Sequence, residues 1–180
     1  MLGQHDGPQL LHRVFHRIVD DKVIIVAGIL KLHLGPQQAA LDEIQNKLGT
    51  RAKIGLLATT GTVQTGIYGD KAKAMGLPMF VPDDVHQERV MAAIYGPQGA
   101  KAGYTNGICR EDLISAAEYL VKTHGCNCLI LGCTELPLIL DESDDFEVAG
   151  SRVIVVDPTA ALARKVVKTA EDAYAATGIR

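Results

Sequence analysis

The sequence predicts an α/β fold organised around a parallel sheet, and two observations support this prediction. From Lys53 onward, short apolar runs alternate with longer segments of helical periodicity, which is the pattern of successive βα units. The composition also fits, because 47% of the 180 residues are hydrophobic, only 4% are aromatic and 22% are charged. A chain of this length is long enough for one main hydrophobic core.

The first part of this pattern predicts two strands, each followed by a helix. Residues 54–59 read as a buried strand, and a single helix is expected from 61 to about 75. A second strand is expected at 77–81, with Pro78 near its start and Pro82 directly after it. The pair Asp83 and Asp84 then caps the next helix, since an aspartate side chain can accept hydrogen bonds from the first free backbone N–H groups.

The helix that begins after these aspartates is expected to turn five apolar side chains toward the core: Val85, Val90, Met91, Ile94 and Tyr95. Beyond it, the sequence predicts a glycine-rich loop at 96–107, a helix at 110–124, a strand at 128–132, a short helical turn at 136–140, a strand at 153–156 and a final helix at 159–176. Four strands are therefore expected between residues 53 and 156.

The first fifty residues have a less regular pattern. It favours a helix at 10–20, a strand at 23–30 and a second helix at 36–48. The apolar stretch 23–30 is too short for a membrane span, which needs about 20 apolar residues. We accordingly divide the chain into an N-terminal segment at 1–50, an α/β lobe at 51–157 and a C-terminal helix at 158–180.

Charge and cysteine content limit the classes of partner. The net charge is -3 and no long run of like charges occurs, so neither nucleic acid nor a membrane surface is expected as a partner. A small molecule is the expected ligand. The four cysteines, with no signal peptide before them, indicate reduced thiols in a cytoplasmic protein.

Two segments lie at the carboxyl ends of predicted strands, where ligands collect in open parallel sheets. The first is the hydroxyl-rich turn Thr59, Thr60, Gly61 and Thr62, whose hydroxyl and backbone donors suit a carboxylate. The second is the segment 132–135, in which a thiol stands where the chain leaves the strand. Both segments are candidate binding or catalytic sites.

Four motifs follow one another along the chain, at residues 53–62, 87–91, 130–137 and 156–159, within a stretch from about Lys53 to Arg164. In sequence and in order they resemble those of the aspartate/glutamate racemases that work without pyridoxal phosphate. Glu135 follows the Cys133-Thr134 pair, which is similar to the aspartate branch of the family. The resemblance identifies the chain as a member of this superfamily.

The resemblance implies the chemistry of the second segment. Inverting an α-carbon requires a group that removes its proton and a group that returns one, and thiols can do both. Cys133 is implied to be one such general acid/base, Thr134 to donate to the substrate carboxylate, and Glu135 to orient the thiol or the substrate amine. The implied protein is an isomerase for aspartate, glutamate or a small dicarboxylate, with no metal and no cofactor.

The family has two similar lobes, and its first lobe supplies another cysteine in a Cys-Asn-Thr type of motif. That motif does not occur in this sequence, and residues 1–50 resemble only the stretch that follows it. We therefore expect one complete Rossmann-like lobe of the racemase fold and an incomplete second lobe. The apolar surface that an incomplete lobe leaves uncovered predicts a homodimer.

Two other functions remain open at the level of sequence. A relative with one thiol, such as a decarboxylase or an isomerase of small carboxylates, protonates a carbanion from one face and needs no second cysteine. A truncated, inactive homologue could instead serve as a binding module for small carboxylates. The position of Met1 as the natural start is also open.

The remaining cysteines and histidines have simpler interpretations. Cys126 and Cys128 are expected to be structural thiols, because no further metal ligand lies near them in sequence. Cys109 precedes a helix and is a minor candidate for the second thiol. His12 and His16 share one face of a predicted helix but lack the glutamate of a zinc motif, so we expect an exposed pair.

Overall fold

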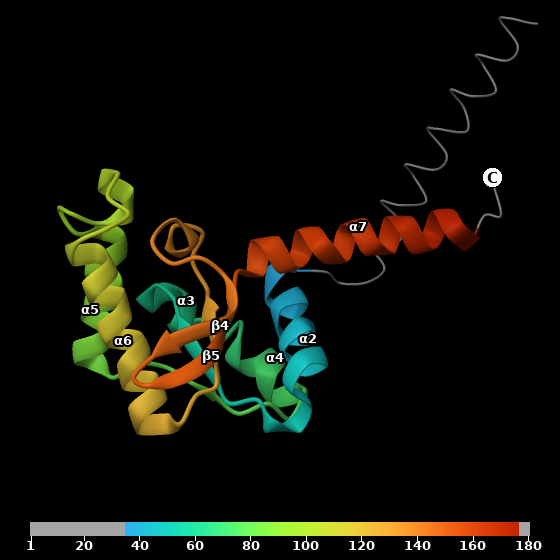
Figure 1. Cartoon of the computed structure of the whole chain (residues 1–180), viewed down its shortest axis with the longest axis horizontal. Helices are drawn as coiled ribbons and strands as arrows, with labels where there is room; N and C mark the ends of the chain where they lie inside the picture. The colour runs from blue at the N-terminus through green and yellow to red at the C-terminus, as the bar shows by residue number, and fades with distance from the viewer. Residues whose placement is uncertain (1–34, 177–180) are drawn as a thin grey trace, which may run out of the picture. The chain divides into compact units, whose positions relative to one another are not determined.

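The computed structural model describes residues 35–176, and Figure 1 shows how their helices and strands are arranged. Residues 35–163 form one compact unit, and the chain from Arg164 belongs to a second. The expected helix at 10–20, the strand at 23–30 and the pair His12 and His16 lie outside the described residues.

The helices and strands follow one another along the chain in an alternating order. They are α2 (Pro36–Leu48), β1 (Ile54–Leu57), α3 (Thr60–Gln64), α4 (Gly69–Ala74), β2 (Met79–Phe80), α5 (Asp84–Tyr95), α6 (Ile108–His124), β3 (Cys128–Leu131), β4 (Ser143–Val148), β5 (Ser151–Val156) and α7 (Pro158–Ala176). Three short 3-10 turns are interspersed among them, at Gly49–Arg51, Ala100–Ala102 and Leu136–Leu138.

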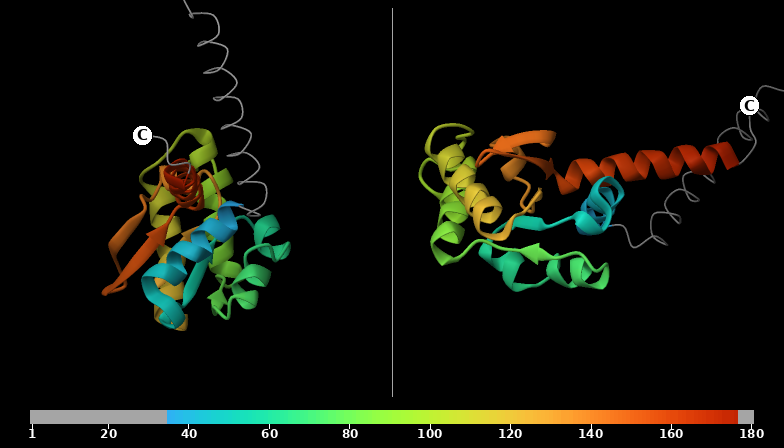
Figure 2. Two further views of the ribbon diagram at one scale, coloured as in Figure 1. Left: turned by 90° about the vertical axis from the view of Figure 1, so that its right-hand side faces the viewer. Right: turned by 60° about the horizontal axis from the view of Figure 1, so that its bottom comes forward.

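The described strands form one five-stranded sheet in the order β2-β1-β3-β5-β4. All neighbouring pairs are parallel except β4 and β5, which are antiparallel. In Figure 1, α5 and α6 lie on one side of the sheet and α2 and α4 on the other, and Figure 2 shows the same layers from two further directions. The predicted α/β fold with a parallel sheet is confirmed.

The expectation of four strands was wrong by one, because β4 was not predicted. Its sequence, Ser143–Val148, carries two aspartates and a glutamate, and only Val148 at its end is buried. Such a polar run has no apolar alternation that would identify a strand. Its place at the edge of the sheet explains the composition, since charged side chains there discourage pairing with other chains.

The single helix expected from 61 to 75 was also wrong, because the structure divides it into α3 and α4. Gly66 lies between them with a φ of +66°. This left-handed conformation suits glycine and ends the first helix. The break allows Tyr68, which is 3% exposed, to pack into the core before α4 begins.

The start of α5 confirms the predicted aspartate cap, while two of its expected core residues are exposed. The Asp83 carboxylate accepts a hydrogen bond from the His86 backbone N–H at 3.0 Å. Val90 and Ile94 are buried, but Val85 is 63% and Tyr95 54% exposed. Each of these two lies five residues from Val90, which turns it about 140° away from the buried face of a helix with 3.6 residues per turn.

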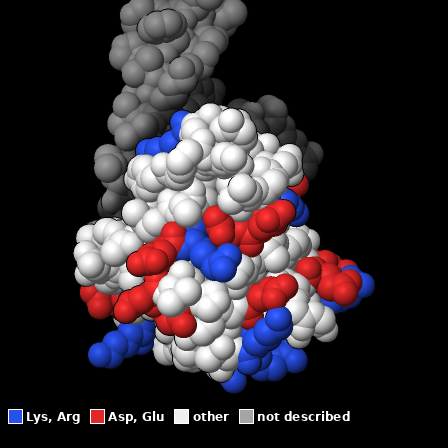
Figure 3. Space-filling model, turned by 90° about the vertical axis from the view of Figure 1, so that its left-hand side faces the viewer, with Lys and Arg blue, Asp and Glu red and all other residues white. Residues whose placement is uncertain are grey.

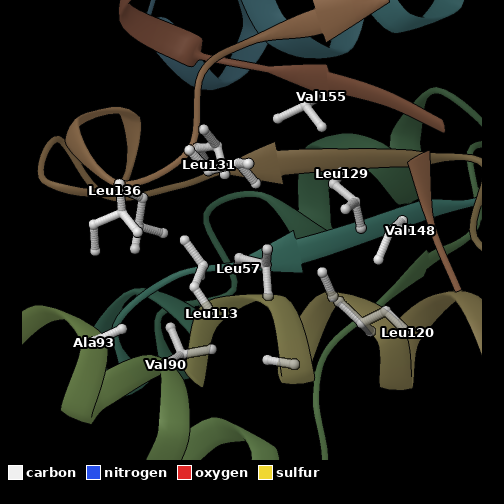
Figure 4. Packing of buried hydrophobic residues seen from close by; sticks show 14 of the residues in the cluster. Leu57, Val90, Ala93, Leu113, Leu120, Leu129, Leu131, Leu136, Val148 and Val155 are labelled. Carbon is white, nitrogen blue, oxygen red and sulfur yellow. The ribbon is translucent and has the colours of Figure 1, made fainter. Parts of the chain in front are cut away.

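Side chains of the sheet enter two separate apolar clusters, one on each face. Successive residues of a strand point to opposite faces, so Leu57 packs with α5 and α6 while Leu56 packs with α2 and α4. Figure 4 shows Leu57 close to Leu113 and Leu120 of α6 in the first cluster. Burial of each such leucine contributes roughly 1.5–3 kcal/mol to folding.

Charged side chains of both signs are interspersed over the face that α5 and α6 cover (Figure 3). An ion pair of 3.1 Å between Arg89 and Asp112 joins these two helices, and Lys122 pairs with Glu118 along α6. Exposed pairs of this kind contribute little stability. None of the helices in the described range is long and apolar enough to cross a membrane.

The close packing of β1 against α6 depends on Gly55. A methyl group at this position would lie 2.7 Å from Leu129 Cδ2 and 2.9 Å from Leu120 Cδ1, both closer than carbon atoms normally approach. Gly55 therefore sets the spacing between the sheet and this helix.

We predict that Gly55→Ala lowers the free energy of unfolding by about 1–3 kcal/mol, as overpacking in a filled core does. Gly69→Ala is the matched control, because no atom lies within 4 Å of the added carbon and the site is at the start of α4. It should leave stability unchanged or raise it slightly. Urea denaturation of the three proteins measures this, and equal stability of Gly55→Ala and the wild type would contradict the packing argument.

Candidate functional site

The pairing of β1 with β3 brings the two predicted segments to the same edge of the sheet. These strands are parallel neighbours, with Leu57 opposite Leu131, and the Gly132 N–H donates to the Leu57 carbonyl at 2.7 Å. Residues 58–62 and 132–135 therefore leave the sheet side by side, although about 70 residues separate them in the chain. The structure therefore brings the two candidate segments together at one edge of the sheet.

Gly132 allows this close approach. A methyl group on it would lie 2.9 Å from Leu56 Cδ1 and 3.0 Å from Ala58 Cβ. Any larger residue would separate the end of β3 from the end of β1. The glycine before Cys133 thus holds the thiol next to the hydroxyl-rich turn.

Cys133, Thr134 and Glu135 form one hydrogen-bonded group. The Cys133 thiol donates to Glu135 Oε2 at 2.9 Å, and the Thr134 hydroxyl donates to the same oxygen at 3.1 Å. The other carboxylate oxygen of Glu135 lies 3.2 Å from Lys101 Nζ. One carboxylate therefore links a thiol, a hydroxyl and an ammonium group.

The charges of this group act on Cys133 in opposite directions. Burial, followed by the hydrogen bond to Glu135, raises the pKa of the Cys133 thiol, and the nearby charge of Lys101 lowers it. The hydrogen bond from Cys133, with the contacts from Lys101 and Thr134, lowers the pKa of Glu135 to about 2. At neutral pH the thiol is therefore protonated while Glu135 is ionised.

Lys101 was not recognised as a candidate in the sequence. It lies in the loop between α5 and α6, within the 3-10 turn Ala100–Ala102. Its ammonium group also stands over the ring of Tyr95, 5.0 Å from the centroid. The glycines of this segment predicted only a loop, and no local pattern pairs Lys101 with a glutamate 34 residues further along the chain.

The threonines of the turn after β1 have different partners. Thr59 caps α3, because its hydroxyl accepts from the Thr62 N–H at 3.3 Å and lies 3.0 Å from the Thr62 hydroxyl. Gly61 is exposed, with open space where a side chain would start. Thr60 is half-buried and contacts α5. The expected cap is thus present, and it occupies two of the three hydroxyls.

Two residues of α5 connect this turn to the rest of the lobe by hydrogen bonds. Gln87 Nε2 donates to the Ala58 carbonyl at 2.9 Å and lies 3.4 Å from the Thr60 hydroxyl. The Thr60 N–H in turn donates to the sulfur of Met91 at 3.4 Å. The sequence motif at 87–91 contains both residues, but it indicated no contact with the turn.

Tyr68 packs in the core as expected, and it also lies within electrostatic reach of the thiol. Burial, together with the negative charges of Asp157 and Cys133, raises the pKa of Tyr68 to about 12. The Asp157 carboxylate accepts from the Thr159 N–H at 2.8 Å, which caps the start of α7. The neutral phenol of Tyr68 therefore belongs to the surroundings of Cys133.

The other three cysteines are buried. Cys109 is 1% exposed and its thiol lies 3.3 Å from the Asn106 carbonyl, so it faces the core. Burial raises the pKa of Cys126 to about 11 and that of Cys128 to about 12. Cys133 is therefore the one partly exposed thiol in the described part of the chain.

A hollow beside the turn after β1 is open and mainly apolar. It has a volume of about 540 Å³ and lies between α3, α4 and β2, where Thr62 and Tyr68 form part of its wall. Cys133, Thr134 and Glu135 do not line it. Within residues 35–176, no cluster of three histidine, cysteine or acidic side chains could hold a metal ion.

The sequence and the fold are similar to those of several known proteins. The chain is 38% identical over 122 residues to an uncharacterized protein in the pnlA 3′ region of Pectobacterium carotovorum subsp. carotovorum, covering 68% of this chain and 75% of that protein. It is 30% identical over 120 residues to the glutamate racemase of Desulforudis audaxviator (strain MP104C), covering 66% and 40%.

Among solved structures, an aspartate racemase homologue from Pyrococcus horikoshii OT3 superposes with a TM-score of 0.62 and 27% identity. This match covers 77% of the present chain and 56% of that one, so the chain spans about half the length of this relative. The model that describes the Asp/Glu/hydantoin racemases matches residues 33–166, which include both strand-end segments. This chain belongs to the Asp/Glu/hydantoin racemase family.

Proposed function

We propose that this protein is an amino-acid racemase that exchanges the α-proton of aspartate or glutamate, with Cys133 as one general acid/base. The observation that carries the proposal is the hydrogen bond of 2.9 Å from the Cys133 thiol to Glu135, at the carboxyl end of β3. Family membership supports the reaction class. The reaction needs neither a metal ion nor pyridoxal phosphate.

The state of the site at neutral pH supports Cys133 as the acid of the reaction. The carbanion forms when the base on the opposite face takes the α-proton. Because Glu135 is ionised and accepts from the thiol, Cys133 holds its proton and gives it to this carbanion at the α-carbon. The S–H bond breaks, a C–H bond forms, and the resulting thiolate is stabilised by Lys101. In the reverse reaction the thiolate takes the α-proton.

The polar groups around Cys133 suit a substrate with two carboxylates. Residues Thr59, Thr60, Gly61 and Thr62 offer donors for one carboxylate on the side of β1. The ammonium group of Lys101, which is 46% exposed, offers donors for the other on the side of β3, and Thr134 would join it by exchanging its hydrogen bond to Glu135 for one to the substrate. This donor set supports an acidic amino acid over a neutral one.

The second acid/base comes from a second copy of the chain. Inversion requires proton transfer on both faces of the α-carbon, and Cys133 is the one partly exposed thiol of residues 35–176. A symmetric dimer would present a second Cys133. We accordingly expect a homodimer, acting in the cytoplasm on a small-molecule substrate.

A second candidate follows from the same observation. A single accessible thiol is sufficient for an enzyme that protonates a carbanion or an enediolate from one face, such as a decarboxylase or an isomerase of small carboxylates. This candidate differs from the racemase in one outcome, because the product of one-sided protonation keeps a single configuration. Formation of D-aspartate from L-aspartate would therefore exclude it.

Cys133→Ser should lower the rate of D-aspartate formation from L-aspartate at least about a hundredfold, the usual contribution of a general acid/base. Cys126→Ala is the matched control, since this thiol is 3% exposed and lies before β3, at the other end of the strand from Cys133. It should retain most of the activity. Chiral chromatography of the product measures both rates, and equal rates for Cys133→Ser and the wild type would remove Cys133 from the mechanism.

Substitutions of Lys101 and of Glu135 should shift the pH profile of kcat/KM in opposite directions. The rise of kcat/KM with pH follows ionisation of the copy of Cys133 that acts as the base. Lys101→Met removes a charge that lowers the pKa of this thiol, so the rise should shift to higher pH. Glu135→Gln removes a charge that raises this pKa, so the same rise should shift to lower pH. Lys122→Met, on the exposed face of α6, is the control. Shifts in the same direction would contradict the electrostatic account.

Sedimentation velocity should give twice the mass of one chain for the active protein. The reason is that a racemase with one accessible thiol per chain needs a second acid/base from another copy. A stable monomer that forms D-aspartate at full rate would contradict the proposed dimer, although Cys133 itself could then still act.

A further inference from the structure

Gln87 has an unusual environment on the first turn of α5. Its Oε1 atom is buried and has no hydrogen-bond partner, and it is the one side-chain atom of this kind among the described residues. A buried acceptor without a donor destabilises a fold, because the oxygen has given up its hydrogen bonds to water. The other half of the same amide, by contrast, has two acceptors within reach.

That other half reaches the turn after β1. Gln87 Nε2 donates to the Ala58 carbonyl at 2.9 Å and has the Thr60 hydroxyl as a second acceptor at 3.4 Å. Ala58 is fully buried, so its carbonyl needs a partner from the protein. The amide thus satisfies the carbonyl of the last residue before the turn and contacts the hydroxyl of Thr60 within it.

This contact decides where the Thr60 proton points. A threonine hydroxyl has one hydrogen and two lone pairs, and when it accepts from Gln87 its own hydrogen remains free to donate. The hydroxyls of Thr59 and Thr62 lie 3.0 Å apart and serve each other and the cap of α3. The Thr60 N–H is also committed, to the sulfur of Met91. The Thr60 hydroxyl therefore keeps its hydrogen for a ligand, and the Thr59 and Thr62 hydroxyls, which share a single hydrogen bond, keep one more between them.

We propose that Gln87 is a positioning residue, which holds the turn and directs the Thr60 hydroxyl toward a carboxylate of the substrate. The identity of the ligand in this inference rests on the proposed function. The effect of Gln87 on the conformation of the turn does not depend on that function. Gln87 acts through Ala58 and Thr60 and does not itself touch the substrate.

Gln87→Met separates this role from a structural one. Methionine has a similar length but no amide, so it removes the orphaned acceptor together with the donor to the turn. The same change also leaves the buried Ala58 carbonyl without its partner, so the two effects on stability oppose each other and we expect a denaturation midpoint close to that of the wild type. We also expect a KM for aspartate raised about tenfold with kcat changed less than about threefold, as for the loss of one oriented hydrogen bond to a carboxylate.

Hydrogen exchange supplies a readout that needs no substrate. The backbone amides of residues 59–62 should exchange about tenfold faster in Gln87→Met than in the wild type, because their anchor on α5 is lost. Gln38→Met is the matched control. Its amide donates to Asp42 at 2.8 Å and to the sulfur of Met75 at 3.2 Å, away from the turn. It should change neither KM nor the exchange of residues 59–62.

Gln87→Glu is the second variant. Its carboxylate would accept from the Thr60 hydroxyl and turn that proton away from the ligand, so KM should rise at least as much as in Gln87→Met. Unchanged KM in this variant would overturn the inference. So would a Gln87→Met protein that is less stable than the wild type yet has unchanged exchange at residues 59–62. A wild type without racemase activity would overturn the proposed function alone, because exchange and stability still decide the role of Gln87.

Discussion

The parallel pairing of β1 with β3 is the constraint on which the site depends. It continues past the last strand residues through the bond of 2.7 Å from Gly132 to the Leu57 carbonyl, and the absence of a side chain at Gly132 permits it. Because both strands end at this edge, the hydroxyls of one segment and the thiol of the other become neighbours. The apolar clusters on both faces of the sheet hold this pairing in place.

The chemistry of the site arises from a balance of charges around one thiol. Glu135 stabilises the protonated thiol of Cys133, while Lys101 stabilises both the ionised Glu135 and a thiolate. A general acid/base must exist in both protonation states during turnover, and neither neighbour alone would allow that. Gln87 holds the turn after β1, on the other side of the site, and its buried Oε1 without a partner lowers the stability of the fold.

Local pattern was sufficient to predict the parallel sheet, the cap at Asp83 and the strand-end position of Cys133, since each depends on neighbouring residues. It failed where tertiary structure decides. The acidic strand β4 exists because β5 offers it a partner. Gln87 reaches the site from α5, and Lys101 reaches it from the loop after α5. Contacts between residues so far apart in the chain do not affect the local periodicity of the sequence.

Exchange of the α-proton in D₂O tests the central claim most directly. L-Aspartate is incubated with the protein, and NMR follows loss of the α-proton signal while chiral analysis follows D-aspartate. The account predicts that α-deuterated aspartate and D-aspartate appear together with the wild type, and that Cys133→Ser produces neither. Deuteration with full retention of the L configuration would support the one-thiol enzyme. Absence of any deuteration by the wild type would contradict proton transfer by Cys133 at the α-carbon of aspartate.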